Sequence, residues 1–273
     1  MAGDYLSEFL VKIITNKRVM NDPEDKKEVF LLGIYAPEIA ASANPGQFLM
    51  VKCSNDSFPL LRRPFSIHSI KCSYVYILYM VLGIGTSWLA SKKRNDSLDV
   101  IGPLGNGFSI KSQSKNLVLI AGGIGIAPIV ALAEHALSKG YKARLIMGAK
   151  KASLLYPKDH LPSGLITRVV TEDGSAGSNG LVTDFLSEAS DASQIFACGP
   201  LPMYRTMNSK KEIFNKIPVQ VSMEQVLGCG YGVCYGCAIE TTRGLKQVCH
   251  DGPVFNLQDV LWNRVIDPRI ERE

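Results

Sequence analysis

The sequence has little excess charge, few histidines and tryptophans, and no long apolar run free of glycine and proline. Its 273 residues include 30 basic and 25 acidic side chains, which give a formal net charge of +5. That excess is too small to indicate a nucleic-acid surface, and the densest basic stretch, residues 92–94, is expected to be a solvated face. A composition of 46% apolar and 20% charged residues excludes a disordered chain, a collagen and a coiled coil.

Two stretches lack the features that secretion or membrane insertion requires. Residues 1–8 carry two acids where a signal peptide has a basic stretch, so we expect no secretion. Residues 116–133 carry no charge, but Pro128 and the three glycines within 122–125 interrupt the run. A strand, a glycine turn and a helix start are therefore expected there, not a membrane helix. We expect a cytoplasmic protein with no membrane contact.

Short β-rich runs separated by turn residues fill the first part of the chain. They lie at residues 9–15, 29–35, 48–53 and 74–82. Evenly spaced strands with almost no helical period predict a small antiparallel barrel.

From about residue 116 the pattern changes to alternating strands and helices. This alternation predicts a parallel sheet covered by helices. Predicted strands cover residues 117–121, 143–148, 166–170 and 194–197, and predicted helices cover 129–137 and 181–188. The last stretch, from about residue 221, is too small for a large apolar core. We therefore expect a metal cluster to stabilise its fold.

Four of the seven cysteines lie close together near the C-terminus. Cys229 is followed after four residues by Cys234, after two more by Cys237, and after eleven more by Cys249. This is the plant-type spacing of a [2Fe-2S] cluster. Without a secretory signal the compartment is expected to be reducing, where clustered cysteines hold metal more often than they form disulfides. The alternative is a zinc site with the same four thiolates, although zinc ligands usually come as two short cysteine pairs.

Two further motifs follow predicted barrel strands. Arg63-Pro64-Phe65-Ser66 offers a cation for a phosphate and a hydroxyl for a ring heteroatom. Gly83-Ile84-Gly85-Thr86 offers bare backbone N–H groups for a pyrophosphate. Each alone also fits an ordinary strand end or turn. Together, and in this order, they indicate an FAD site.

A glycine-rich turn, Ala121-Gly122-Gly123-Ile124-Gly125, lies between a predicted strand and a predicted helix. Glycines there let a dinucleotide pyrophosphate approach the helix N-terminus. The spacing departs from the usual dinucleotide fingerprint, so a plain structural turn is the alternative. Cys198-Gly199-Pro200 and residues 171–175 lie at later strand ends, where parallel sheets bind their ligands.

The order of these motifs resembles the ferredoxin reductase superfamily over nearly the whole chain. Within it, the sequence resembles the family of electron transfer subunits of NAD-dependent dihydroorotate dehydrogenase B. The most discriminating parts are the cysteine cluster that follows the nucleotide domain and the Cys249-His-Asp-Gly-Pro-Val-Phe ending. The other matching stretches are residues 61–66, 102–108, 171–175 and 223–237.

The resemblance implies a multi-domain β and α/β oxidoreductase. Its parts would be an FAD-binding barrel (1–108), an NAD-binding α/β domain (109–220) and a [2Fe-2S] domain (221–273) that faces a separate catalytic subunit carrying FMN. Two copies of each subunit would assemble into a heterotetramer. Electrons would run from dihydroorotate through FMN, the cluster and FAD to NAD⁺, in the synthesis of the pyrimidine nucleotide UMP.

The resemblance also assigns site residues. Cys198 would lie near the nicotinamide, although a small buried apolar role is the alternative. Met80 departs from the family, which often has arginine there, so one phosphate contact would be lost or supplied from elsewhere. Lys150 and Lys151 follow a strand where a 2′-phosphate could bind, which leaves NADP open. The FAD ligands would be Arg63, Pro64, Phe65, Ser66, Leu78, Tyr79, Met80, Gly85 and Thr86, the NAD ligands Gly122, Gly123, Gly125 and Gly199, and the metal ligands Cys229, Cys234, Cys237 and Cys249.

Two other functions stay open at this point. One is a reductase that passes electrons from NAD(P)H to a ferredoxin or an oxygenase, since that function needs the same cofactors. The other is a non-catalytic interaction module with a four-cysteine zinc site and no working flavin site.

Overall fold

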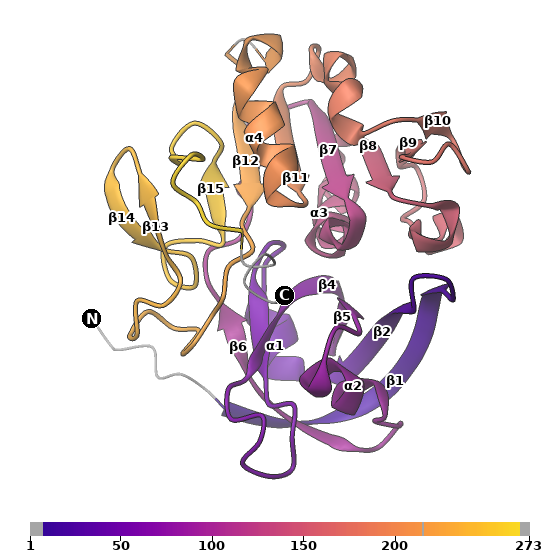
Figure 1. Cartoon of the computed structure of the whole chain (residues 1–273), viewed down its shortest axis with the longest axis vertical. Helices are drawn as coiled ribbons and strands as arrows, with labels where there is room; N and C mark the ends of the chain where they lie inside the picture. The colour runs from indigo at the N-terminus through magenta and orange to yellow at the C-terminus, as the bar shows by residue number, and fades with distance from the viewer. Residues whose placement is uncertain (1–7, 215, 268–273) are drawn as a thin grey trace.

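A computed structural model of the chain describes residues 8–214 and 216–267. A barrel built from the first part of the chain lies below a sheet built from the middle part, and the C-terminal part lies beside the sheet (Figure 1). No helix of the described residues is long and apolar enough to cross a membrane.

Six antiparallel strands close the barrel in the order β1-β2-β5-β4-β3-β6, which confirms the predicted barrel. β1 runs further than predicted, and its pairing with β2 shifts register between Ile13 and Thr15 and between Arg18 and Met20. Such bulges bend a strand, so one long strand can follow the barrel wall. The strands are β1 (Glu8–Asp22), β2 (Lys27–Tyr35), β3 (Phe48–Val51), β4 (Arg63–Lys71), β5 (Tyr74–Met80) and β6 (Ser97–Leu104).

Two features of the barrel differ from the sequence prediction. Arg63 opens β4, because Arg63 and Pro64 already pair with Val51 and Met50 of β3. Two short helices, α1 (Pro37–Ser42) and α2 (Ile84–Ala90), also lie among the strands. Runs of six and seven residues are too short to show a helical period.

Seven strands form the second sheet in the order β10-β9-β8-β7-β11-β12-β15. Every neighbouring pair from β10 to β12 is parallel, which confirms the predicted parallel sheet, and only β12 and β15 are antiparallel. The strands are β7 (Asn116–Gly122), β8 (Lys142–Ala149), β9 (Ile166–Thr171), β10 (Ser178–Asn179), β11 (Gln194–Cys198), β12 (Val219–Ser222) and β15 (Val254–Asn256).

The helices beside this sheet include one correction. The helix predicted at 181–188 is two 3₁₀ turns, η4 and η5, because Phe185 between them has φ −107° and ψ 15°. The Asp184 carboxylate accepts the Leu181 N–H at 2.8 Å and closes the first turn. The helices are η1 (Gly123–Gly125), α3 (Ile126–Ser138), η2 (Ala152–Leu154), η3 (Lys158–His160), η4 (Val182–Asp184), η5 (Leu186–Ala189), α4 (Leu201–Ser209) and η6 (Lys211–Phe214).

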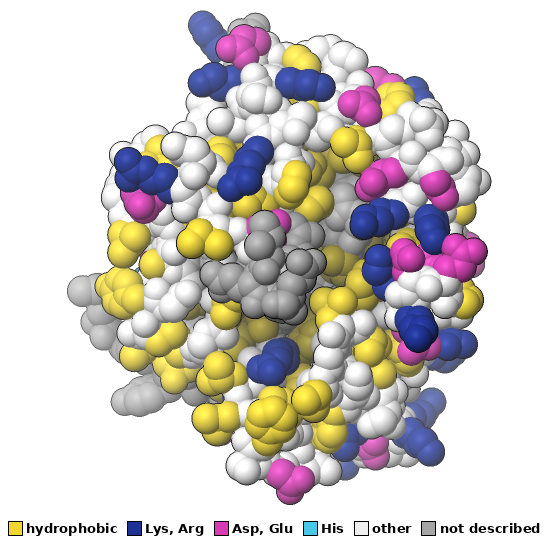
Figure 2. Space-filling view, in the orientation of Figure 1, with side chains coloured by type: hydrophobic (Ala, Val, Ile, Leu, Met, Phe, Trp, Pro, Cys, Tyr) yellow, Lys and Arg dark blue, Asp and Glu magenta, His cyan; other side chains and the backbone are white. Residues whose placement is uncertain are grey.

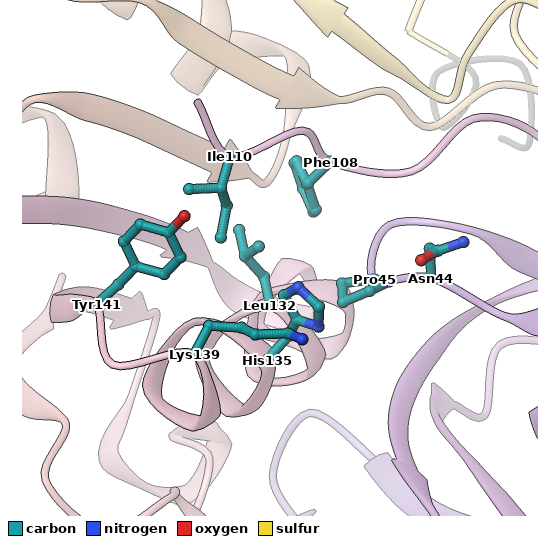
Figure 3. A pocket seen from close by; sticks show the side chains of 8 residues that line it. All are labelled: Asn44, Pro45, Phe108, Ile110, Leu132, His135, Lys139 and Tyr141. Carbon is teal, nitrogen blue, oxygen red and sulfur yellow. The ribbon is translucent and has the colours of Figure 1, made fainter. Parts of the chain in front are cut away.

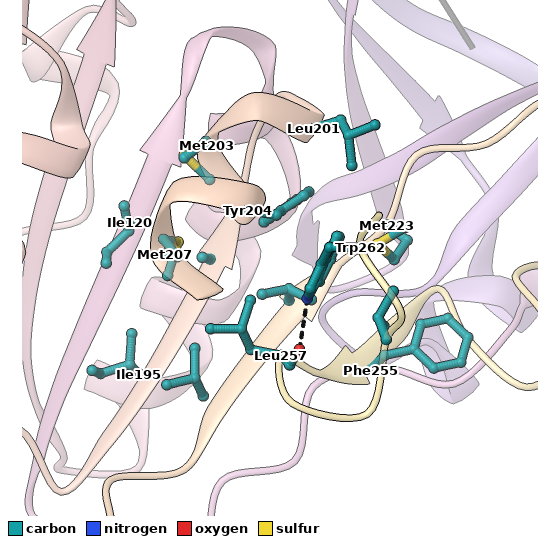
Figure 4. Packing of buried hydrophobic residues seen from close by; sticks show 14 of the residues in the cluster. Ile120, Ile195, Leu201, Met203, Tyr204, Met207, Met223, Phe255, Leu257 and Trp262 are labelled. Atoms are coloured by element: carbon teal, nitrogen blue, oxygen red, sulfur yellow. Dashed lines mark hydrogen bonds between the residues drawn. The ribbon is translucent and has the colours of Figure 1, made fainter. Parts of the chain in front are cut away.

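The C-terminal segment packs on the edge of the sheet. β13 (Ala238–Thr241) and β14 (Gly244–Gln247) form a hairpin. Trp262 packs on Tyr204 of α4 at 5.1 Å between ring centroids, and its indole N–H donates to Leu257 O at 2.7 Å (Figure 4). The buried side chains of this segment therefore share one core with the sheet. The division at residues 108 and 220 stays a prediction.

Candidate functional site

The glycine-rich turn at 122–125, here called the nucleotide loop, packs against the end of β11. A Cβ on Gly125 would lie 2.2 Å from Cys198 O, and one on Gly199 would lie 3.2 Å from Gly122 N. Only glycine allows the two strand ends to approach so closely. Gly123 has φ +56° and faces open space. A pyrophosphate therefore has room to reach the N-terminus of the 13-residue helix α3, and these residues fit NAD.

Cys198 lies beside this loop with its thiol protonated. Burial, reinforced by Glu224, raises the pKa of Cys198 to about 12, although hydrogen bonds with Tyr204 and Ser222 oppose the shift. Tyr204 fixes the surrounding backbone, since its hydroxyl accepts the Gly199 N–H at 2.9 Å and donates to Ser222 O at 2.6 Å. Cys198 is thus a neutral, half-buried side chain at physiological pH. Its place near a nicotinamide stays a prediction.

Arg63 and Arg62 differ sharply in their surroundings. Arg62 makes a two-pronged ion pair with Asp99 at 2.7 and 2.9 Å and also pairs with Glu8. Arg63 donates to Leu61 O at 2.7 Å and has no ion pair among the residues that the structure describes. An arginine without an acidic partner is available to bind an anion.

The two predicted FAD motifs meet at Gly85. A Cβ on Gly85 would lie 3.5 Å from Arg63 Cγ and Nε. In the rest of the first motif, Pro64 is exposed, Ser66 is half-buried and Phe65 is buried. The first motif therefore offers a guanidinium, a proline and a hydroxyl at the barrel surface, and this set fits a flavin.

The predicted FAD residues of β5 do not all face outwards. Leu78 is buried and Met80 is partly buried, both against the core that contains the nucleotide domain's α3. The Tyr79 phenol points into the barrel, where it stacks on Phe30 and donates to Asn16 Oδ1 at 3.1 Å. Only the backbone of Tyr79 is left to serve a ligand.

The hydroxyl of Thr86 stabilises the turn at residues 82–86 that precedes and begins α2. It accepts the backbone N–H groups of Leu82 at 2.8 Å and Gly83 at 3.1 Å. Gly83 faces open space, as a turn that receives a phosphate requires.

Lys151 is already paired. Its ammonium lies 2.8 Å from Glu24 and 3.7 Å from Asp22, both at the tip of the β1–β2 hairpin. At the end of β9, Asp173 accepts the Ser175 N–H and hydroxyl, and these bonds lower the pKa of Asp173. A 2′-phosphate would compete for Lys151 with carboxylates that are already in place.

The four clustered thiols lie in two pairs. Cys229 and Cys234 each donate a backbone N–H to the sulfur of the other at 3.5 Å. The sulfurs of Cys237 and Cys249 lie 3.3 Å apart. Within the described residues, no three His, Cys, Asp or Glu side chains surround a single metal position. Two thiolates for each of two irons is the donor set of a [2Fe-2S] cluster.

Backbone N–H groups of the cluster loop, residues 228–237, surround these sulfurs. Gly232 N donates to Cys249 Sγ at 3.2 Å, Val233 N to Cys229 Sγ at 3.4 Å and Gly236 N to Cys234 Sγ at 3.4 Å. Burial raises the pKa of Cys229, but backbone N–H groups outweigh it and bring that pKa to about 6. The loop thus favours the thiolate of Cys229, the metal-binding form, whereas burial and the neighbouring Cys237 raise the pKa of Cys249 to about 12, so that thiol must lose its proton when a metal binds. The residues fit an iron-sulfur cluster.

The segment that follows Cys249 contacts the cluster loop on one side and the stretch after β6 on the other. A Cβ on Gly232, which has φ +89°, would lie 3.1 Å from the His250 ring. Asn106 Nδ2 donates to His250 O at 3.0 Å and to Asp251 O at 3.1 Å. Asn106, which anchors the backbone next to Cys249, is not among the predicted site residues. Its position in the stretch 102–108, which matches the family, was the available signal.

Apolar side chains are exposed in the cluster loop and in a barrel loop, residues 52–62 between β3 and β4. In the cluster loop Val233 is 70% exposed and Tyr235 is 61% exposed, and in the barrel loop Phe58 and Leu60 are 71% and 79% exposed. Figure 2 shows apolar side chains spread over the barrel and the C-terminal part of one face. Large exposed apolar patches mark surfaces where other proteins bind.

A separate cavity of about 300 Å³ lies where the barrel meets the sheet (Figure 3). None of the predicted site residues lines it. Its lining residues are Asn44, Pro45, Phe108, Ile110, Leu132, His135, Lys139 and Tyr141.

Known proteins resemble the chain at two levels of detail. Residues 224–261 match the iron-sulfur cluster binding domain of dihydroorotate dehydrogenase B. The electron transfer subunit of dihydroorotate dehydrogenase B (NAD⁺) from Bacillus caldolyticus is 39% identical over 226 residues, 80% of this chain and 86% of the relative. The corresponding subunit from Bacillus cereus strain Q1 is 31% identical over 256 residues, 90% of this chain and 98% of the relative.

Solved structures share the fold. An NADH-dependent reduced ferredoxin-NADP oxidoreductase, studied for flavin-based electron bifurcation, superposes with a TM-score of 0.81 at 27% identity, over 96% of this chain and 92% of the other. A ferredoxin NADP⁺ reductase from Neisseria gonorrhoeae, solved with FAD and NADP, has a TM-score of 0.62 at 16% identity, over 76% of this chain and 92% of the other. The second likeness shows the fold alone.

Proposed function

This chain belongs to the family of electron transfer subunits of dihydroorotate dehydrogenase B, and from that membership we propose that it carries electrons from an FMN-bearing catalytic subunit to NAD⁺ in pyrimidine biosynthesis. It is an oxidoreductase whose cofactors are FAD, a [2Fe-2S] cluster and NAD. The observation that carries the proposal is the pairing of the four thiols in a loop of N–H groups, which a flavin reductase without a cluster does not need.

Different residues of the chain would bind each cofactor. Cys229 and Cys234 would hold one iron, and Cys237 and Cys249 the other. Arg63 would neutralise a phosphate of FAD, and Gly123 would leave room for the pyrophosphate of NAD. When bound, FAD exchanges a hydride with NAD⁺ and single electrons with the cluster.

The partner would dock over the cluster loop. Cys234 is exposed, and Val233 and Tyr235 project beside it. Aromatic and apolar side chains are enriched where partners bind, and a cluster near the surface can pass electrons to another protein. We propose that the FMN-bearing subunit covers this loop, that two copies of each subunit assemble, and that the complex works in the cytoplasm.

The test is reconstitution with a catalytic subunit. The chain is coexpressed with an FMN-dependent dihydroorotate dehydrogenase, and NAD⁺ reduction by dihydroorotate is measured along with iron, sulfide and flavin. We expect about two irons, two sulfides and one FAD per chain and NAD⁺-dependent turnover. Zinc without flavin would support the interaction-module alternative. Electron delivery to a ferredoxin, without coupling to dihydroorotate, would support the general reductase.

A matched pair of cysteine variants tests whether electrons pass through the cluster. Cys229→Ser should lose visible iron absorbance and transfer from the catalytic subunit, yet keep NADH-driven dye reduction at FAD. Cys72→Ser is the control, because Cys72 is a free thiol that lies in the barrel, between β4 and β5. Equal loss in both variants would contradict the assignment of the cluster ligands.

A further inference from the structure

His68 links the barrel to the nucleotide domain. It lies on β4, two residues after Ser66, and is only 2% exposed. Its Nδ1 lies 2.9 Å from Ala127 O, in the first turn of α3, and its Nε2 lies 2.8 Å from the Tyr156 hydroxyl. One imidazole therefore contacts two separate parts of the nucleotide domain.

The chemistry of these partners fixes the direction of both bonds. A carbonyl can only accept, so Nδ1 carries the proton and donates to Ala127 O. Nε2 then accepts the Tyr156 hydroxyl. Burial lowers the pKa of His68 to about 4, so the imidazole is neutral. A buried pair with every polar atom satisfied imposes one geometry on the groups it joins.

The loop that carries Tyr156, residues 150–165 between β8 and β9, is held to the barrel at two places. At its start, Lys151 pairs with Glu24, and the Ser153 hydroxyl donates to Asp22 Oδ2 at 3.1 Å. Near its middle, the Tyr156 hydroxyl donates to His68 Nε2. The same loop touches the end of β9, because Ala152 N donates to Ser175 Oγ at 2.8 Å. The barrel therefore fixes the position of this loop beside the end of β9, where parallel sheets bind their ligands.

The strand that carries His68 also carries the FAD motif, and the helix turn that it contacts follows directly on the nucleotide loop. We propose that His68 and Tyr156 are a positioning pair, which sets the angle between β4 and the nucleotide loop and so the approach of the nicotinamide to the flavin. This inference rests on the proposed function. Neither residue touches the reacting atoms. Their effect comes through placement, to which hydride transfer is sensitive, since a shift of about 1 Å can cost about 100-fold in rate.

A conservative variant tests the pair. Tyr156→Phe removes one hydroxyl and leaves the ring packed. We expect FAD and iron contents to be kept and the melting temperature to stay within about 4 °C. The KM for NADH in ferricyanide reduction should rise about tenfold, and the deuterium isotope effect on kcat/KM with NADH labelled at the transferred hydrogen should increase. Tyr141→Phe, elsewhere in the nucleotide domain, should change neither quantity.

Two variants of His68 keep the test decisive. His68→Asn keeps a donor for Ala127 O, so its isotope effect should lie between those of the wild type and His68→Leu. The proposal that His68 and Tyr156 position the nucleotide is wrong if Tyr156→Phe and His68→Leu fold and keep the wild-type KM and isotope effect. It is also wrong if these variants lose only kcat, in proportion to the fraction of protein that is folded. A wild-type chain whose flavin NADH cannot reduce would instead overturn the proposed function.

Discussion

Gly230 of the cluster loop lies directly against Met50 of barrel strand β3. Its φ is +88°, and a Cβ there would be 2.6 Å from Met50 Cγ. Met50 is fully buried and pairs with Pro64 across the β3–β4 ladder. A single residue of β3 therefore separates the cluster loop from the strand that carries the FAD motif.

Gly230→Ala should disturb this contact. The new methyl group would meet Met50 and force an unfavourable backbone angle, which together cost about 1–3 kcal/mol. We expect a lower iron content and faster cluster loss, measured by absorbance and iron assay. Gly244→Ala is the control, because Gly244 has φ +90° but open space around it. Equal iron loss in both variants would show that backbone strain, not the contact with Met50, is responsible.

Gly123→Ala should weaken nucleotide binding while leaving the fold intact. The added methyl group would occupy the open space over the N-terminus of α3, where the pyrophosphate is expected. We expect the Kd for NADH, measured by flavin reduction, to rise about tenfold, which corresponds to about 1.4 kcal/mol. Gly140→Ala, with φ +80° and open surroundings, carries the same backbone cost at the far end of that helix. A similar Kd for both variants would argue against a nucleotide at this loop.

Replacing Arg63 or Arg62 by glutamine should affect different quantities, FAD binding in the first case and stability in the second. Arg63→Gln should raise the Kd for FAD with little change in stability. Arg62→Gln should lower the free energy of unfolding by about 1–3 kcal/mol, because it breaks the charged bonds to Asp99, and leave the FAD Kd unchanged. Flavin fluorescence and urea titration measure the two quantities. A weaker FAD site in Arg62→Gln alone would reverse the assignment.

His68 should make the protein less stable in mild acid. Its pKa is about 4 when folded, because of burial, and 6.5 as a free side chain, and the charges of Lys71 and His160 push it the same way. The folded state thus disfavours the proton, so stability is complete above pH 6.5 and is lost as the pH falls towards 4. Between pH 7 and 5 the loss is about 2 kcal/mol.

Urea unfolding at the two pH values checks this sign. The stability difference between pH 7 and pH 5 should be smaller by about that amount in His68→Asn. If the variant retains the full difference, other groups than His68 cause the acid sensitivity.

Local sequence patterns predicted most of the fold. The features that were not predicted depend on contacts between residues far apart in the sequence. The barrel and the parallel sheet follow from strand spacing and alternation, and the cysteine spacing predicts the cluster. The prediction of a helix at 181–188 was wrong. The apolar residues there have helical spacing, but the chain turns at Phe185 and forms two 3₁₀ turns instead. The roles of Lys151 and His68 could not be predicted, since Glu24 and Tyr156 lie 127 and 88 residues away from them.

Strand β15 gives the C-terminal segment a second role. Its residues cover the outer edge of β12, with Ser222 opposite Val254 and Gln220 opposite Asn256. A chain cut after residue 222 would leave β12 as a bare edge strand, a template for unwanted pairing with other chains, and would uncover the Tyr204 face of α4. The segment with the four thiols is therefore part of the sheet's own packing, because it covers a strand edge and a helix face that would otherwise be exposed.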